Sequence, residues 1–241
     1  MAHLRLGSVA PDFEADTTEG RIKFHEWAGE SWVMLFSHPG DFTPVCTTEL
    51  ADVSQRLPQF VKRDVKIIAI SVDSLKTHFE WIDDIIEIGN MMSPSIPTCV
   101  EYPIIADGER QIATLYGMLD EQDKTNVDED GLPYTIRTVF IIDPKRFIRT
   151  MIQYPASVGR DFDEIIRVID ALQASDKHKI ATPVSWRPGS DVIIPSHISD
   201  EEARKRFSKF DTVLPYLRMT QDPTQSAKSP SCNGIGKKTS A

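Results

Sequence analysis

Cys46 lies in a segment, His38–Cys46, that reads HPGDFTPVC and favours a reactive thiol. We predict that an apolar strand ends just before this segment and that a helix begins directly after it, at Thr47. Cys46 then lies near a helix N-terminus, where free backbone N–H groups and the positive end of the helix dipole favour a thiolate. The thiolate is the nucleophilic form of cysteine, and Thr43, one helical turn earlier, can place a hydroxyl beside it. Position alone leaves a second interpretation open, in which Cys46 is a small buried apolar residue.

The elements that must position this segment alternate between strands and helices. Apolar, β-branched runs predict strands over residues 31–37 and 65–72, and a turn at Asp143-Pro144 predicts an antiparallel pair over residues 137–142 and 147–153. Apolar residues at helical spacing predict helices over residues 47–61, 75–88, 111–117 and 161–174. In the helix over residues 75–88 we place Phe79, Ile82, Ile85 and Ile86 on one side, with a stop at Gly89-Asn90. This order predicts an α/β fold with a mixed sheet.

We expect three parts along the chain. The alternating elements predict a first domain over residues 1–175. After Ala181 the chain becomes rich in proline, with one helical segment over residues 199–207 capped by Ser199 and Glu202. This predicts a C-terminal arm over residues 176–220 that packs on a neighbour. Residues 221–241 are rich in small and polar residues and hold almost no large apolar side chain, which predicts a flexible tail.

Composition excludes several classes of protein. With 241 residues and a formal net charge of −9, the chain has no electrostatic basis for nonspecific nucleic-acid binding. No apolar run reaches the roughly 20 residues of a membrane helix, and no apolar signal segment is visible, so we expect a cytoplasmic protein without membrane insertion. Cys46, Cys99 and Cys232 form no C-x-x-C pair, and no zinc-binding spacing is present.

Pro39, Thr43 and Cys46 together form the pattern P-x-x-x-T-x-x-C, which resembles the signature of the peroxiredoxins. Peroxiredoxins are thiol peroxidases. Residues 36–39, 41–50, 70–74 and 159–164 resemble the 1-Cys, or peroxiredoxin 6, subfamily, and the resemblance covers about residues 4–220. It implies a thioredoxin-like α/β fold, with a central mixed β-sheet flanked by helices and an extended C-terminal arm. It also implies a homodimer or a higher oligomer.

The resemblance implies roles for four residues at the centre of the site. Cys46 would be the peroxidatic nucleophile that reduces hydrogen peroxide and organic or lipid hydroperoxides through a sulfenic acid. Arg137 would face the thiolate and donate hydrogen bonds to the peroxide. Thr43 would hold the peroxide in line with the sulfur, and Pro39 would shield the sulfur from water.

Three further residues would support this centre. Glu49 and Arg160 resemble the pair that orients the arginine in this family. His38 resembles a subfamily histidine at the border of the pocket. Without the resemblance, each of these charges is equally consistent with an ordinary surface or structural role.

The residue at the position of the usual resolving cysteine indicates how the sulfenic acid is reduced. Two-cysteine peroxiredoxins hold a resolving cysteine in a C-terminal Cys-Pro-x-x-Trp segment, and here Thr182 stands at that position before Pro183 and Trp186. The resemblance therefore implies a 1-Cys mechanism with an external thiol reductant such as glutathione, and no bound cofactor. Cys99 has no activating neighbour in the sequence, and we expect Cys232 to be a spare thiol of the tail.

Two other functions stay open. The same thiolate could serve a redox-sensing or chaperone-like oligomer rather than an enzyme. Some members of the subfamily are credited with phospholipase A2 activity through a serine motif, and Ser31 with His25 resembles part of it. The motif lacks its closing glycine at Val33, and Lys145 stands at the position of the expected aspartate, with Asp143 nearby.

Overall fold

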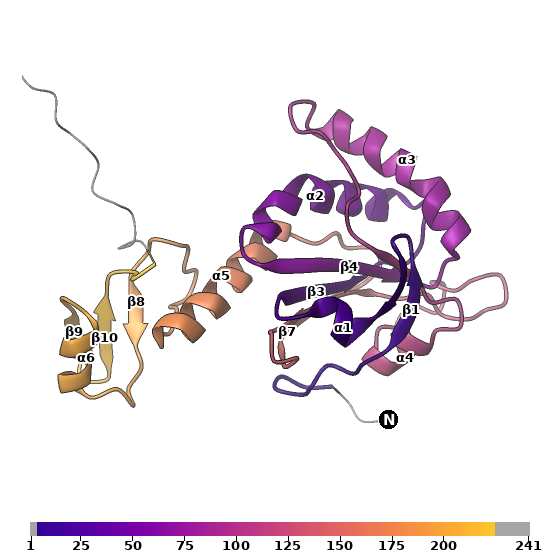
Figure 1. Ribbon diagram of the computed structural model, residues 1–241. Helices are drawn as coiled ribbons and strands as arrows, with labels where there is room; N and C mark the ends of the chain where they lie inside the picture. The colour runs from indigo at the N-terminus through magenta and orange to yellow at the C-terminus, as the bar shows by residue number, and fades with distance from the viewer. Residues whose placement is uncertain (1–3, 225–241) are drawn as a thin grey trace, which may run out of the picture. The chain divides into compact units, whose positions relative to one another are not determined.

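The computed structural model describes residues 4–224, and the chain divides into two compact units between Asp163 and Glu164 (Figure 1). The first unit is built on a seven-stranded sheet in the order β2-β1-β5-β4-β3-β6-β7. β3, β4 and β5 run parallel to one another, and the other pairs are antiparallel, so the sheet is mixed as predicted. The strands are β1 (Glu14–Thr17), β2 (Gly20–Lys23), β3 (Trp32–Ser37), β4 (Val65–Ser71), β5 (Ile104–Ala106), β6 (Arg137–Ile142) and β7 (Ile148–Tyr154).

Helices cover both faces of this sheet. They are α1 (Phe24–Ala28), α2 (Pro44–Val61), α3 (Leu75–Met92) and α4 (Gln111–Tyr116). In Figure 1, α2 and α3 lie on one side of the sheet and α1 and α4 on the other. The α1 and α4 side buries one continuous apolar cluster that includes Phe24, Tyr116 and Leu35. Burial of such side chains supplies about 1.5–3 kcal/mol each, which fixes the helices on the sheet.

The register of β6 against β3 brings distant parts of the chain together. β6 runs antiparallel to β3, and Phe36 pairs with Val139. At the end of β3, the Ser37 hydroxyl donates to the Ile136 carbonyl (2.5 Å) and accepts from the Thr138 N–H (3.0 Å). The residues that follow β3 therefore lie beside the first residue of β6, Arg137.

The helix α3 differs from its prediction in length and in its buried face. It continues through Gly89-Asn90 to Met92. Gly89 is required for close packing rather than for a stop, because a Cβ at this position would lie 2.3 Å from the Thr98 hydroxyl oxygen. The buried stripe includes His78, Trp81 and Ile85, whereas the predicted core residue Phe79 is exposed.

The second unit forms a small core of its own. Its elements are most of α5 (Phe162–His178) and then β8 (Val192–Ile194), α6 (Asp200–Arg206), β9 (Asp211–Leu214) and β10 (Leu217–Thr220). The three strands form a sheet in the order β8-β10-β9, which the sequence did not predict. Trp186, Ile194 and Phe207 are buried between them. The Ser199 part of the predicted cap of α6 is confirmed, since its side chain accepts from the Glu202 N–H at 3.2 Å, whereas the Glu202 carboxylate pairs with Arg206.

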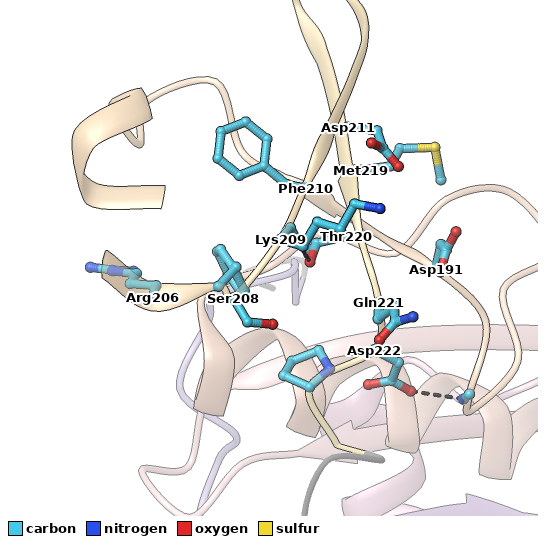
Figure 2. A pocket seen from close by; sticks show the side chains of 13 residues that line it. Asp191, Arg206, Ser208, Lys209, Phe210, Asp211, Met219, Thr220, Gln221 and Asp222 are labelled. Atoms are coloured by element: carbon cyan, nitrogen blue, oxygen red, sulfur yellow. Dashed lines mark hydrogen bonds between the residues drawn. The ribbon is translucent and has the colours of Figure 1, made fainter. Parts of the chain in front are cut away.

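A cavity of about 910 Å³ opens in this second unit, and Figure 2 shows its lining, Lys209, Thr220 and Asp222 among them. Asp222 is buried, and its carboxylate accepts from the Gly189 N–H at 2.8 Å. The packed chain thus extends to residue 222. Residues 225–241 of the predicted tail, including Cys232, lie outside the described residues, and the domain boundaries at 175 and 220 stay predictions.

Candidate active site

Cys46 is the third residue of α2 and is completely buried. Thr43 is the N-cap and Pro44 the first helical residue, where a missing N–H costs nothing. The Thr43 hydroxyl donates to the Gly40 carbonyl at 2.8 Å and so closes the preceding loop. The predicted placement of Cys46 at a helix N-terminus is confirmed, and the helix dipole favours a negative charge on its sulfur.

Arg137 is the cation that faces this sulfur. Its Nη1 atom lies 3.2 Å from Cys46 Sγ and 2.7 Å from Glu49 Oε2. Its Nε and Nη2 atoms donate to the Ala156 carbonyl at 2.9 and 2.6 Å. The guanidinium is thus held from two sides, and one of its N–H groups points at the thiol.

Glu49 joins Arg137 to a second buried arginine. Glu49 and Cys46 are three residues apart and share one side of α2. Arg160 donates to Glu49 through Nε (3.0 Å), Nη2 (2.6 Å) and its backbone N–H (2.7 Å). Its Nη1 donates to the Ser37 carbonyl at 2.8 Å, so the network reaches the end of β3.

The charges of this network favour a thiolate. Burial opposes ionisation of Glu49, but Arg160 and Arg137 prevail and hold the pKa of that carboxyl below its ordinary value. Two guanidinium groups and one carboxylate leave a buried excess of one positive charge. An anion at Cys46 Sγ balances that excess. The structure therefore brings together four of the predicted residues, Cys46, Arg137, Glu49 and Arg160.

Pro39 and His38 belong to the loop between β3 and α2, and both are buried. His38, expected at the border of the pocket, contacts Asp41 through Nε2 at 3.0 Å and packs its ring on Trp81. Asp41 also contacts the buried His78. Asp41 lies in the stretch over residues 41–50 that resembles the subfamily, but nothing in the sequence pairs it with His78.

One group of possible metal ligands is found among residues 4–224, and it is formed by His38 and Asp41 of this loop together with Asp73, which follows β4. Both carboxylates already accept hydrogen bonds: Asp41 faces two histidines, and Asp73 accepts from Ser71 Oγ (2.6 Å) and from the Asp41 N–H (3.0 Å). The arrangement is therefore accounted for by hydrogen bonding, and we assign no metal to it.

The residues of the possible lipase motif have other partners. The Ser31 hydroxyl donates to Asp64 Oδ1 at 2.8 Å. His25 contacts the Ala10 carbonyl through Nε2 at 2.8 Å, and its Nδ1 lies 3.8 Å from Asp12 Oδ2. In the described part of the chain, Ser31 and His25 thus form no nucleophile–base pair with each other. Among the same residues, no helix has the length and apolarity needed to cross a membrane.

Comparison with known proteins decides the family. The model of the AhpC/TSA family matches residues 6–151, and that of the C-terminal domain of 1-Cys peroxiredoxin matches residues 171–209. Peroxiredoxin-6 of Homo sapiens is 48% identical over 227 residues, which cover 91% of this chain and 98% of the human protein. The chain belongs to the peroxiredoxin family. A mitochondrial peroxiredoxin of Saccharomyces cerevisiae is also 48% identical, over 90% of this chain and 81% of its own length.

Solved structures of peroxiredoxins have the same fold as this chain. A cysteine-to-serine mutant of peroxiredoxin 6 from Arenicola marina has a TM-score of 0.85 at 44% identity and covers 91% of this chain and 99% of its own. The yeast mitochondrial 1-Cys peroxiredoxin has a TM-score of 0.81 at 47% identity, over 90% and 99% of the two chains. The fold is the thioredoxin-like fold of the peroxiredoxins, with a C-terminal extension that carries a further sheet. The protein is a thiol peroxidase of the 1-Cys group.

Proposed function

We propose that this peroxiredoxin reduces hydrogen peroxide and organic or lipid hydroperoxides with Cys46 as its nucleophile. The observation that carries the assignment is the 3.2 Å contact between Arg137 Nη1 and the buried Cys46 Sγ. The thiolate attacks the terminal peroxide oxygen, so that an S–O bond forms while the O–O bond breaks. The departing oxygen takes a proton and leaves as water or an alcohol, and Cys46 becomes a sulfenic acid.

The neighbouring residues have distinct roles in this step. Arg137 donates a hydrogen bond where negative charge develops on the departing oxygen, which is the most effective place for a fixed donor. Thr43 orients the peroxide, and Pro39 keeps water from the sulfur. Glu49 and Arg160 act through Arg137, whose guanidinium they hold in place.

An external thiol completes the cycle. One thiol attacks the sulfenic acid to give a mixed disulfide and water, and a second thiol releases Cys46 and leaves as the oxidised disulfide. Thr182 supports this route because it occupies the position of the usual resolving cysteine. The structure of the yeast relative concerns resolution by the glutathione and thioredoxin systems. We therefore propose glutathione or a thioredoxin-type protein as reductant.

Peroxide consumption by Cys46→Ser, with Cys99→Ser as the matched control, tests the assignment. We expect the first variant to be inactive and the second to turn over at the wild-type rate, since Cys99 is exposed and outside the network. Turnover by Cys46→Ser would refute it. A redox-sensing oligomer is oxidised once per chain, whereas an enzyme consumes many equivalents of reductant per chain. The amount of reductant consumed per chain therefore separates the two functions. Mass spectrometry of the peroxide-treated protein would show whether Cys46 stops at the sulfenic acid.

We further propose a homodimer formed through the C-terminal unit. Val213, Leu214 and Tyr216 support it, because these apolar side chains at the β9–β10 turn are all exposed. Light scattering should give a molecular mass of twice that of the chain, and the substitution Tyr216→Glu should lower this measured mass. We propose the cytoplasm as the compartment, because three scattered cysteines are too few for the disulfide framework that is typical of small secreted proteins. Because one relative is mitochondrial, cell fractionation is the test.

A further inference from the structure

Three buried side chains meet at the loop that joins β3 to α2. The side chains of His38 and His78 are 0% exposed and that of Asp41 is 1% exposed. Asp41 Oδ1 lies 3.0 Å from His38 Nε2, and Asp41 Oδ2 lies 2.6 Å from His78 Nδ1. The other nitrogen of His78, Nε2, lies 3.1 Å from the Ile105 carbonyl oxygen. The loop, α3 and β5 thus meet at one carboxylate and one imidazole.

The contacts of His78 determine which of its ring nitrogens carry a proton. A carbonyl oxygen only accepts, so Nε2 donates to Ile105. Nδ1 faces a carboxylate oxygen, and a proton must lie between them, because otherwise two lone pairs would meet in a buried site. Burial opposes ionisation of Asp41, but hydrogen bonds from His38 and His78 prevail and lower its pKa to about 2. The shared proton therefore belongs to His78, which is an imidazolium paired with Asp41.

His38 has a different state. Its Nε2 donates to the Asp41 carboxylate, while its buried Nδ1 has no hydrogen-bond partner among residues 4–224. A proton on Nδ1 would bury an N–H without an acceptor, so His38 is neutral. Asp73 lies close to His38 and Asp41, and its carboxylate accepts from Ser71 and from the Asp41 N–H. Asp41 is thus the counterion of His78.

This cluster controls the loop that leads to Cys46. Asp41 is held by its side chain and also by its backbone N–H, which donates to Asp73 Oδ2 at 3.0 Å. Trp81, which packs on the His38 ring with centroids 5.2 Å apart, donates to Thr47 Oγ1 at 3.1 Å. Thr47 directly follows Cys46. The loop and the first turn of α2 are therefore both tied to the cluster.

We propose that Asp41 and His78 are positioning residues of the peroxidase reaction, whose buried ion pair holds the loop over residues 38–43 and so places Pro39 and Thr43 relative to Cys46. The proposal rests on the peroxidase role proposed above for Cys46. Neither residue contacts the sulfur or the peroxide in this assignment. Both act by fixing the geometry in which the thiolate meets the O–O bond, where small displacements cost rate.

The protonation of the His78 ring is tested first, on the whole wild-type chain, by ¹⁵N NMR of its histidines at pH 7.5. We expect one histidine with protons on both ring nitrogens, protected from exchange, and we expect its signals to vanish in His78→Gln and to remain in His197→Gln, the exposed control. A neutral ring at His78 would overturn the proposal. This measurement involves no peroxide, so its result is independent of whether Cys46→Ser abolishes turnover.

Kinetics test the positioning role in Asp41→Asn and His78→Gln. We expect the rate constant of Cys46 oxidation by peroxide, measured by stopped flow, to fall on the order of 10-fold or more, because loop geometry is lost. Alkylation of Cys46 by iodoacetamide needs a thiolate but no in-line peroxide, so its rate should change less than about 2-fold. Equal losses in both reactions, or a wild-type peroxide rate in both variants, would overturn the proposal.

The unequal response of the two reactions separates this role from general loss of structure, because general loss of structure would change the alkylation rate as well. If Asp41→Asn does not fold, His78→Gln and the NMR of the wild type still decide the question.

Discussion

Glu49 and Arg160 lie 111 residues apart in the chain and form a bidentate ion pair, with Nη2 of the arginine 2.6 Å from Oε2 and its Nε 3.0 Å from Oε1. Both side chains are buried. The backbone N–H of Arg160 adds a third hydrogen bond to the same carboxylate. The pair thus fixes where the loop before α5 meets α2, and it does so one helical turn from Cys46.

Removal of the Glu49 charge should destabilise the fold. Glu49→Gln leaves Arg137 and Arg160 buried without their shared anion, and breaking such a buried pair costs about 3–5 kcal/mol. Urea denaturation measures the free energy of unfolding. The control is Glu14→Gln, whose ion pair with Arg21 is exposed and should contribute less than about 1 kcal/mol. Equal stability of the two variants would contradict the role assigned to the network.

Acid stability should depend on Asp41. Its folded pKa of about 2 lies below the ordinary value of 3.8, so its contribution is complete above pH 3.8 and is lost as the pH falls toward 2. A shift of this size corresponds to about 2 kcal/mol. The free energy of unfolding of Asp41→Asn should therefore vary less between pH 4 and pH 2 than that of the wild type. Asp16→Asn, at an exposed position, should follow the wild type.

Arg137 should determine the rate of peroxide attack. In Arg137→Ala the sulfur loses its facing cation and the departing oxygen loses a donor, and the loss of one such donor costs about 100–1,000-fold in rate. Arg137→Lys should recover part of the rate, because it keeps the charge but not the planar fork that also reaches Glu49 and Ala156. Stopped-flow oxidation of Cys46 is the measurement, with Arg21→Ala as an unaffected control. A wild-type rate in Arg137→Ala would refute this role.

The long apolar elements of the fold were predictable, as were the short helices α4 and α6, whereas the shortest strands were not. β3, β4, β6, β7, α2 and α5 each have an apolar pattern long enough to identify them from the sequence alone. β1, β2 and β5 have only three or four residues, which is too few to show a periodic apolar pattern. They form because they pair with other strands of the sheet. In α3 the burial of His78 in place of Phe79 depends on Asp41, which the helix sequence does not contain.

Gly89 should not tolerate a side chain. In Gly89→Ala the new Cβ would overlap the Thr98 side chain, and overpacking of this kind costs about 1–3 kcal/mol. Thermal denaturation of Gly89→Ala and of Gly89→Ala/Thr98→Ala measures the cost, and the second change should recover part of it. Gly108→Ala is the control, since its nearest atom lies at 3.8 Å. No loss of stability in Gly89→Ala would show that the helix can shift away from Thr98.

The 1-Cys assignment makes Cys232 dispensable. A chain that ends at Thr224 keeps the buried Asp222 and lacks Cys232, and its turnover with a small external thiol should equal that of the full chain. Mass spectrometry of the peroxide-treated full chain should show no Cys46–Cys232 disulfide. A large loss of turnover together with such a cross-link would assign Cys232 as a resolving cysteine.

The residues of the candidate site could be proposed from the sequence, but their connections could not. The P-x-x-x-T-x-x-C pattern pointed to Pro39, Thr43 and Cys46 because these residues lie in one short segment of the chain. Arg137 and Arg160 were found through resemblance, and their shared contact with Glu49 is a product of the strand register. The pair of Asp41 and His78 spans 37 residues and belongs to no short motif, so it becomes visible only in three dimensions.

The distance along the chain between Cys46 and its cations has a consequence for synthesis. The ribosome makes Cys46 and Glu49 first, and Arg137 follows Cys46 by 91 residues. Until β6 and the loop that carries Arg160 have emerged and paired, the thiol has no guanidinium beside it. On the role proposed above for Arg137, we expect a nascent or partly unfolded chain to carry a cysteine that is slow toward peroxide, whose reactivity rises only when the sheet is complete. We expect a growing chain to be spared oxidation of Cys46 for the same reason.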